Sequence, residues 1–239
     1  MLLAAIILSV VFTSLGFLVT PGNAKYILSG YNTMSEADRA KMDITSYIRF
    51  FRKFHIFLGA TLLAGFFIMK LINNNWAGAF IIIYPILAYV FLVAKGSTFY
   101  RGTTGQRSAT YVIMAILIVI TAGVSLQLYS SLQNSELILT ANELEIKGIY
   151  GLKLNKTDIS KVELVPALPP ISYKSNGFAA GDFAKGAFVT KDGRSVKLFV
   201  NKKTNPFLFI TTKTDQIYYS SDAVASQALY DKLRDWSAN

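Results

Sequence analysis

Residues 109–129 read ATYVIMAILIVITAGVSLQLY, a run of 21 residues without Lys, Arg, Asp or Glu. A helix needs roughly 20 apolar residues to cross about 30 Å of hydrocarbon, so this run is long enough to span a membrane. Three further runs have similar composition, namely residues 2–19, 54–72 and 76–94, and Lys70 is the only charged residue within them. The sequence therefore predicts a transmembrane region of four helices within residues 1–130.

The first apolar run also has a second interpretation. Residues 2–19 could form a cleaved signal peptide, with Gly22 and Ala24 at the small-residue positions before the cut. No Lys or Arg precedes the run, and a signal peptide normally begins with positive charge. A retained span is therefore the favoured interpretation.

The composition excludes several kinds of functional site. Of the 239 residues, 52% are hydrophobic and 16% are charged, which is more apolar than ordinary soluble domains. The chain has no cysteine and one histidine, His55, which excludes disulfides, cysteine nucleophiles and clusters of Cys and His ligands. No Ser/His/Asp constellation is recognisable either. We therefore expect no enzymatic activity, no metal and no cofactor.

The distribution of positive charge predicts which segments face the cytoplasm. The net charge is +10, of which residues 1–135 contribute +7. Nine basic residues lie in two segments between predicted spans, residues 20–53 and 95–108: Lys25, Arg39, Lys41, Arg49, Arg52, Lys53, Lys95, Arg101 and Arg107. Short loops rich in Lys and Arg stay in the cytoplasm, so we predict that both segments are cytoplasmic loops and both termini lie outside. Because the excess charge lies in these loops, we do not expect a nucleic-acid partner.

A Gly-Tyr-Asn-Thr sequence at residues 30–33 follows the first apolar run. Ser35 and Asp38 then form a helix start that resembles a capping box. This region, residues 1–95, resembles a family of small bacterial membrane proteins of unknown function marked by the same tetrapeptide after their first helix. The resemblance implies a bacterial cell membrane. Tyr31, Asn32 and Thr33 are candidate residues for docking a cytoplasmic partner, and the alternative is that they form only a turn and a helix cap.

From residue 137 onward the hydrophobic pattern changes to that of short β-strands. Runs rich in β-branched and aromatic residues occur at residues 137–140, 143–150, 152–155, 159–164, 186–190, 195–200, 207–212 and 216–219. Turn residues separate them, including Lys191-Asp192-Gly193-Arg194. Residues 222–236 have helical spacing, and Asp222 is the expected cap. We predict an all-β domain over residues 135–239 that ends in a capping helix.

The same region resembles the bacterial pleckstrin-homology-like domain family. The residues that carry the resemblance are Leu144 to Tyr150 with Gly151, Asp158-Ile159, Leu168-Pro169, Asn176-Gly177, Gly181, Gly186 with Phe188, and Leu229-Tyr230. The resemblance implies a bent sheet, closed as a barrel or sandwich, whose open end the last helix covers. It implies no single ligand, because this fold serves many unrelated functions.

The leading functional hypothesis is a membrane-anchored binding or scaffolding protein whose β domain recognises a protein, peptide or envelope ligand. Binding at a sheet edge or at loops near residues 174–182 is expected. The candidate ligand-binding residues are Lys174, Asn176, Lys197, Lys202 and Lys203. The alternative is a small transporter, channel or accessory subunit with the β domain as a lid. Homo-oligomerisation through Gly59, Ala60 and Ala64 is a further possibility.

Overall fold

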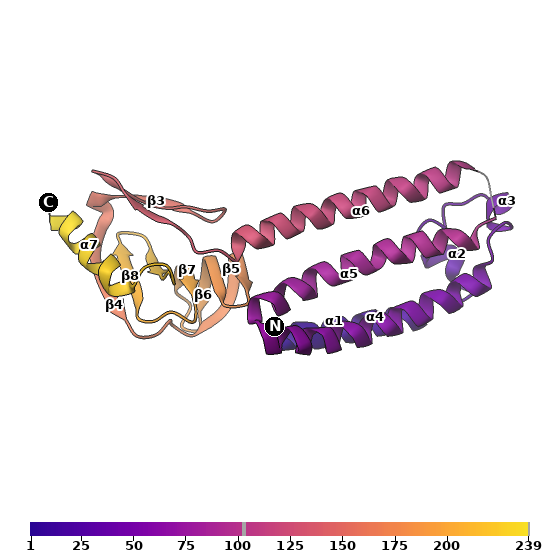
Figure 1. Cartoon of the computed structure of the whole chain (residues 1–239), viewed down its shortest axis with the longest axis horizontal. Helices are drawn as coiled ribbons and strands as arrows, with labels where there is room; N and C mark the ends of the chain where they lie inside the picture. The colour runs from indigo at the N-terminus through magenta and orange to yellow at the C-terminus, as the bar shows by residue number, and fades with distance from the viewer. Residues whose placement is uncertain (102–103, 239) are drawn as a thin grey trace. The chain divides into compact units, whose positions relative to one another are not determined.

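The computed structural model describes the backbone of residues 1–101 and 104–238, and the side chains of these residues except 104–107 and 238. The chain divides into two compact units, Met1–Leu126 and Gln127–Asn239. Each unit is described here by itself. The first unit is helical, and the second contains the β-strands (Figure 1).

The first unit is built from long apolar helices joined by short ones. Its elements are α1 (Leu2–Leu18), α2 (Ala24–Ile27), α3 (Glu36–Arg39), α4 (Ile44–Ile72), α5 (Asn74–Gly96), the 3-10 helix η1 (Ser97–Phe99) and α6 (Thr104–Ser131), whose last residues belong to the second unit. Within the described residues, α4, α5 with η1, and the Ser108–Ser131 part of α6 are long and apolar enough to cross a membrane. These three helices indicate a multi-pass membrane protein. The helix at the first predicted span, α1, is apolar but has only 17 residues.

The helix α4 begins earlier than the apolar run that it contains. Asp43 caps its first turn, because the carboxylate accepts a hydrogen bond from the Ser46 amide at 3.0 Å. The last ten residues of the predicted loop 20–53 are therefore helical, and Arg49 lies within the first two turns. At the other end Asn73 alone separates α4 from α5, and its side chain caps α5 by accepting from the Asn75 amide at 2.7 Å. Only a tight turn therefore joins these two helices.

Small residues bring α1 close to α4, and Figure 1 shows the two helices side by side. The Ser9 hydroxyl donates to the Gly59 carbonyl at 2.8 Å, and a Cβ at Gly59 would lie 2.2 Å from Thr13 Oγ1. Gly16 also lies close to α4, because a Cβ at Gly16 would be 3.0 Å from the Arg52 carbonyl oxygen. Gly59 therefore lies in the contact between α1 and α4, whereas Ala60 and Ala64 are exposed, and homo-oligomerisation stays a prediction.

The second unit contains two separate β-sheets. A three-stranded sheet has the order β1-β2-β3, and a six-stranded sheet has the order β4-β8-β9-β7-β6-β5, in which β7 and β9 are parallel. The strands are β1 (Leu137–Leu139), β2 (Glu143–Ile146), β3 (Leu152–Asn155), β4 (Ile159–Val165), β5 (Ile171–Ala180), β6 (Phe183–Thr190), β7 (Ser195–Asn201), β8 (Phe207–Thr212) and β9 (Gln216–Tyr219). Within the described residues no ladder joins the two sheets, so the closed barrel that we expected is not formed.

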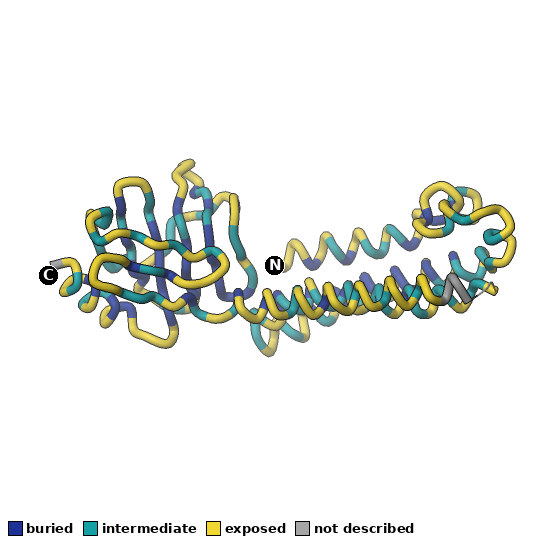
Figure 2. Tube along the Cα trace, turned by 90° about the horizontal axis from the view of Figure 1, so that it is seen from above, coloured by how far each residue is buried: buried dark blue, intermediate teal, exposed yellow. Residues whose placement is uncertain are grey.

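Apolar side chains fill both faces of the six-stranded sheet, and the buried positions concentrate in the strands (Figure 2). On one face Phe199 and Ile210 pack with Leu144 of the small sheet and with Leu233 of the last helix, α7 (Ser226–Ala238). On the other face a second cluster includes Phe188, Val196 and Leu198, with Leu168 packed against it. The β domain therefore has its own hydrophobic core.

Three elements of this domain differ from the sequence predictions. β2 ends at Ile146 instead of residue 150, because residues 148–151 turn and Gly148 has a φ of +131°. α7 begins at Ser226, and Asp222 does not cap it, because its carboxylate accepts hydrogen bonds from the side chains of Asn134 and Asn201. Finally, residues 171–180, which were expected to be loop, form the longest strand of the domain, β5.

Candidate functional site

The strand β5 forms one edge of the six-stranded sheet (Figure 1). Within the described residues it pairs only with β6, so the backbone groups along its other side have no partner strand. Residues 172–176 and Ala179 are exposed, and the Tyr173 side chain is 59% exposed. The part of β5 from residue 175 to residue 180 has no charged side chain. Such an edge is a template for pairing with another extended segment.

The opposite edge strand, β4, has the usual protection against pairing. Lys161 and Glu163 lie on it and form an ion pair at 2.8 Å, and its register shifts between Ile159 and Lys161. Charges and bulges on an edge strand disfavour addition of another strand. The β5 ladder also shifts register, between Ile171 and Tyr173 and between Lys174 and Asn176. Beyond these shifts, residues 176–180 pair regularly with β6 and carry no charge, so this part of β5 is the edge that is open to pairing.

Two glycines set the close approach between β5 and β6. Gly177 and Gly186 lie directly opposite each other in the ladder. A Cβ at Gly177 would lie 2.2 Å from the Lys185 carbonyl oxygen, and a Cβ at Gly186 would lie 2.4 Å from the Asn176 carbonyl oxygen. Gly186 also has a φ of +106°, which a residue with a side chain rarely adopts. Both glycines belong to a strand pair. Gly186 lies in a strand as predicted, whereas Gly177 is not in the loop that was expected near residues 174–182.

The predicted ligand-binding lysines do not form one free cationic patch. Lys203 pairs with Asp182 at 2.9 Å, and Lys197 pairs with Asp215 at 3.0 Å. The Lys202 ammonium donates to the Gly181 carbonyl at 2.7 Å, and burial lowers the pKa of its amine. Two of these lysines thus hold the turn after β7 against the turn between β5 and β6, and each of the three already has a partner.

The other two predicted residues lie on β5 itself. Lys174 is opposite Phe188 and Asn176 is opposite Ala187 in the register with β6. Adjacent residues of β6 point to opposite faces of the sheet, so Lys174 and Asn176 also leave the strand on opposite faces. Both residues are exposed on β5. The structure therefore places Lys174 and Asn176 on the edge strand β5, where they do not point toward one common binding site.

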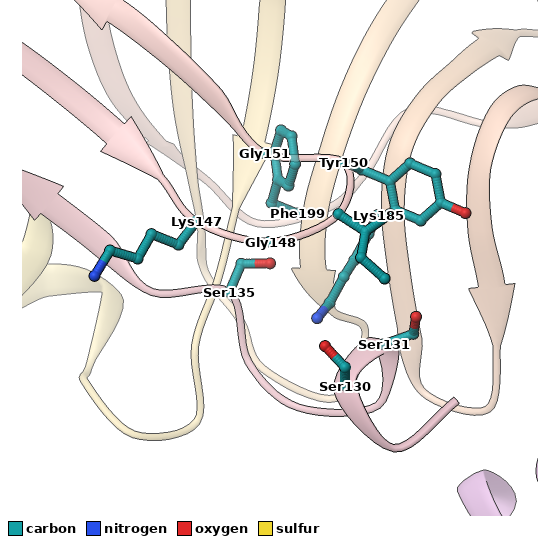
Figure 3. A pocket seen from close by; sticks show the side chains of 10 residues that line it. Ser130, Ser131, Ser135, Lys147, Gly148, Tyr150, Gly151, Lys185 and Phe199 are labelled. Carbon is teal, nitrogen blue, oxygen red and sulfur yellow. The ribbon is translucent and has the colours of Figure 1, made fainter. Parts of the chain in front are cut away.

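A small cavity lies within the second unit, beside Lys185 of β6 (Figure 3). The Lys185 side chain is only 7% exposed, and its ammonium donates to the Gln133 carbonyl. Burial lowers the pKa of this amine. The lining also includes Ser130, Ser131 and Ser135. Lys185 was not among the residues predicted from the sequence, because a Lys in an alternating strand is expected on the solvent side.

The Gly-Tyr-Asn-Thr segment forms a turn in the first unit. Gly30 has a φ of +86°, and the Thr33 hydroxyl donates to the Gly30 carbonyl at 3.2 Å. Tyr31 packs against the buried cluster around Phe51, whereas Asn32 and Thr33 are exposed. Ser35 caps α3 as expected, since its hydroxyl accepts from the Asp38 amide at 3.1 Å.

The two basic segments of the first unit contact each other. The Asp43 amide donates to the Phe99 carbonyl at 3.0 Å, and the Arg101 amide donates to the Lys41 carbonyl at 3.0 Å. The Tyr100 hydroxyl also donates to the Asp38 carboxylate at 3.1 Å. The segment before α4 and the segment after α5 therefore lie at the same end of this helical unit.

The helical region has a recognisable relative. Residues 6–100 match a domain of unknown function (DUF3784). The match begins within α1 and ends just after η1, so it includes the Gly-Tyr-Asn-Thr turn and leaves α6 and the β domain outside. Comparison with curated proteins and with solved structures gives no match.

Proposed function

We propose that this chain is a membrane-anchored binding protein whose β domain takes up an extended segment of a protein partner at the free edge of β5. The observation that carries the proposal is the free edge of β5, where residues 172–176 and Ala179 are exposed and residues 175–180 carry no charge, so that backbone groups without a partner strand are offered. Main-chain hydrogen bonds from such an edge supply affinity, and side chains of alternate residues supply specificity. Tyr173 and Phe178 are the large side chains on this strand that would contact the partner.

The proposal extends to the fold of the β domain and to the number of spans. Two sheets that share one core, with a C-terminal helix packed against it, support a pleckstrin-homology-like fold, in line with the residues that carry that resemblance. We further infer that α1 crosses the membrane as a fourth span. Its 17 residues are at the lower limit of about 17–25 residues for a spanning helix, and its antiparallel contact with α4 supports a path alongside α4 through the bilayer.

The proposed location of the β domain is the outer side of the cell membrane. Two basic segments meet at one end of the helical unit, and positive residues near span ends remain in the cytoplasm. With both segments inside, α6 runs outward and its C-terminal end lies outside. This result does not depend on α1, which affects only the side of the N-terminus. The partner is then a protein of the cell envelope.

Site-specific photo-crosslinking in cells tests the proposal. A photoreactive phenylalanine analogue is placed at Tyr173 on β5 in the full chain, and a matched analogue is placed at Val224, which is 44% exposed elsewhere in the β domain. We expect one dominant adduct from position 173 and none from position 224. Equal adduct patterns from both positions would argue against a specific site on β5.

An affinity measurement with the captured partner then separates edge pairing from other contacts. Ala179→Lys adds a charge on the exposed part of β5, and Ser160→Lys adds the same charge on β4. An extended peptide from the captured region should bind the purified full-length A179K variant at least tenfold more weakly, because a charged edge disfavours strand addition. S160K should bind as the wild type does. A peptide that binds both variants equally would refute the edge mode.

A further inference from the structure

Lys185 is a buried cation without a counter-ion among the described residues. Its side chain is 7% exposed, yet it forms no ion pair with any carboxylate of residues 1–101 and 104–238. The closest acidic residue along the strand, Asp182, pairs with Lys203 instead. The Lys147 ammonium, whose residue also lines the cavity, points away from it toward Glu136 at 3.3 Å (Figure 3). A buried charge is costly unless it is paired.

The ammonium group has more donors than the structure uses. A lysine has three N–H donors, and among the described residues only the Gln133 carbonyl accepts from Lys185. The face of the Phe183 ring, 5.6 Å from Nζ, covers one further side. A carbonyl and a ring face stabilise the cation but do not neutralise it. The remaining donor capacity is directed into the cavity.

Hydroxyl groups converge on the same space. The hydroxyls of Ser130 and Ser135 point toward the cavity that the Lys185 ammonium also faces (Figure 3). Neither hydroxyl has a hydrogen-bond partner among the described residues, and Ser135 is buried. A hydroxyl can rotate to donate, so the cavity combines one cation with two unused O–H donors and no carboxylate.

The part of the cavity around Lys185 is small, and exposed residues such as Ser130 and Gly148 line its mouth. The centre of a water-sized sphere can occupy about 20 Å³ inside the cavity. By the same measure, about 10–15 Å³ is enough for one water molecule. A phosphate or a carboxylate-bearing molecule needs several times this space. We infer that the cavity beside Lys185 binds one monatomic anion, chloride under cellular conditions, which the ammonium pairs with and the Ser130 and Ser135 hydroxyls coordinate. The anion would stabilise the β domain where the chain leaves α6.

Chloride titration of the purified full-length protein in detergent micelles tests this inference. Sodium chloride is exchanged for sodium gluconate at constant ionic strength, and thermal unfolding is followed by circular dichroism. Because a ligand that binds only the folded state stabilises it, the wild-type Tm should rise saturably with chloride, by about 5 °C at ten times the dissociation constant. The ³⁵Cl NMR line should also broaden in the presence of the protein. A Tm and a line width that do not respond to chloride would overturn the inference.

Two substitutions locate the effect. Lys185→Met removes the cation and keeps an apolar chain of similar length, so it should abolish both the Tm response and the line broadening. Lys202→Met is the matched control, because Lys202 also donates to a backbone carbonyl but lies beside Asp182; it should respond as the wild type does. If K185M does not fold, Lys185→Gln with the NMR measurement replaces it. A chloride response that persists without Lys185 would place the anion elsewhere and refute the site.

Discussion

At Gly59 the absence of a side chain determines how closely α1 approaches α4. Gly59→Ala would place a methyl group 2.2 Å from Thr13 Oγ1 and 2.6 Å from the Ser9 backbone oxygen. The backbone atom cannot move aside without shifting α1, so we expect a loss of about 1–3 kcal/mol in the free energy of unfolding. Unfolding in mixed detergent micelles, followed by circular dichroism, measures the loss.

Gly123→Ala on α6 is the control for that substitution. A Cβ at Gly123 meets nothing within 4 Å, and alanine favours the helix over glycine. Its stability should equal or exceed that of the wild type. If G59A is as stable as G123A, then α1 does not pack on α4 as closely as the structure describes.

Asp192, at the turn between β6 and β7, has a pH-dependent role. Side-chain hydrogen bonds from Arg194 and Thr190 lower the pKa of its carboxyl group from 3.8 to about 2. Because the pKa is lowered in the folded state, these contacts stabilise the turn above pH 3.8, and the stabilisation is lost as the pH falls toward 2. Arg194→Gln should therefore raise the pKa of Asp192 toward 3.8. NMR titration of the carboxyl carbon checks this value, and Arg234→Gln on α7 should leave it unchanged.

At the scale of single residues, the sequence shows which side chains are basic but not which groups they contact in the folded protein. Lys197, Lys202 and Lys203 were candidate ligand-binding residues in the sequence analysis. Their partners are Asp215, the Gly181 carbonyl and Asp182. Each contact joins two turns or strand ends that meet only in the folded sheet. Local sequence therefore gives no information about which of these cations already have a partner.

At the scale of elements, β5 depends on its glycine pair. Gly186→Ala would force a residue with a side chain to a φ of +106° and would place its Cβ 2.4 Å from the Asn176 carbonyl oxygen. We expect β5 to open more often, so amide hydrogen exchange across residues 171–180 should accelerate at least tenfold, while β8 and β9 remain protected.

Substitution of a second glycine distinguishes the effect of this clash from the effect of a positive φ alone. Gly193, at the tip of the β6–β7 turn, has a φ of +85° and nothing within 4 Å of its Cβ position. Gly193→Ala should therefore affect exchange only near that turn. Equal acceleration of β5 in G186A and G193A would show that the Gly177–Gly186 approach does not hold the edge strand.

The elements that the sequence predicted correctly have strong local signals. The long helices follow from uncharged apolar runs, and the β6–β7 hairpin follows from Asp192-Gly193. The strand β5 was missed because its residues ISYKSNGFAA include Ser, Lys, Asn, Gly and Ala, which have low strand propensity. Pairing with β6 overrides that propensity. The open edge proposed for binding is therefore the part of the fold that sequence reasoning could least predict.

At the scale of the whole molecule, the charge pattern predicts the side of the membrane on which the β domain lies. The chain has no cysteine, so single cysteines give an unambiguous labelling experiment. Lys213→Cys is on the β domain, where the Lys213 side chain is 71% exposed, and Glu36→Cys is in the basic segment before α4. Loss of the exposed Lys213–Asp158 pair costs little.

With a membrane-impermeant maleimide, we expect intact cells to label K213C and to leave E36C unlabelled until they are permeabilised. Leu2→Cys, at the start of α1, tests the fourth span in the same cells: it should label with K213C if α1 crosses the bilayer, and with E36C if α1 remains on the cytoplasmic side. Labelling of E36C but not K213C in intact cells would place the free edge of β5 in the cytoplasm. The partner would then have to be a cytoplasmic protein, while the pairing of its extended segment with β5 would remain testable by the A179K measurement.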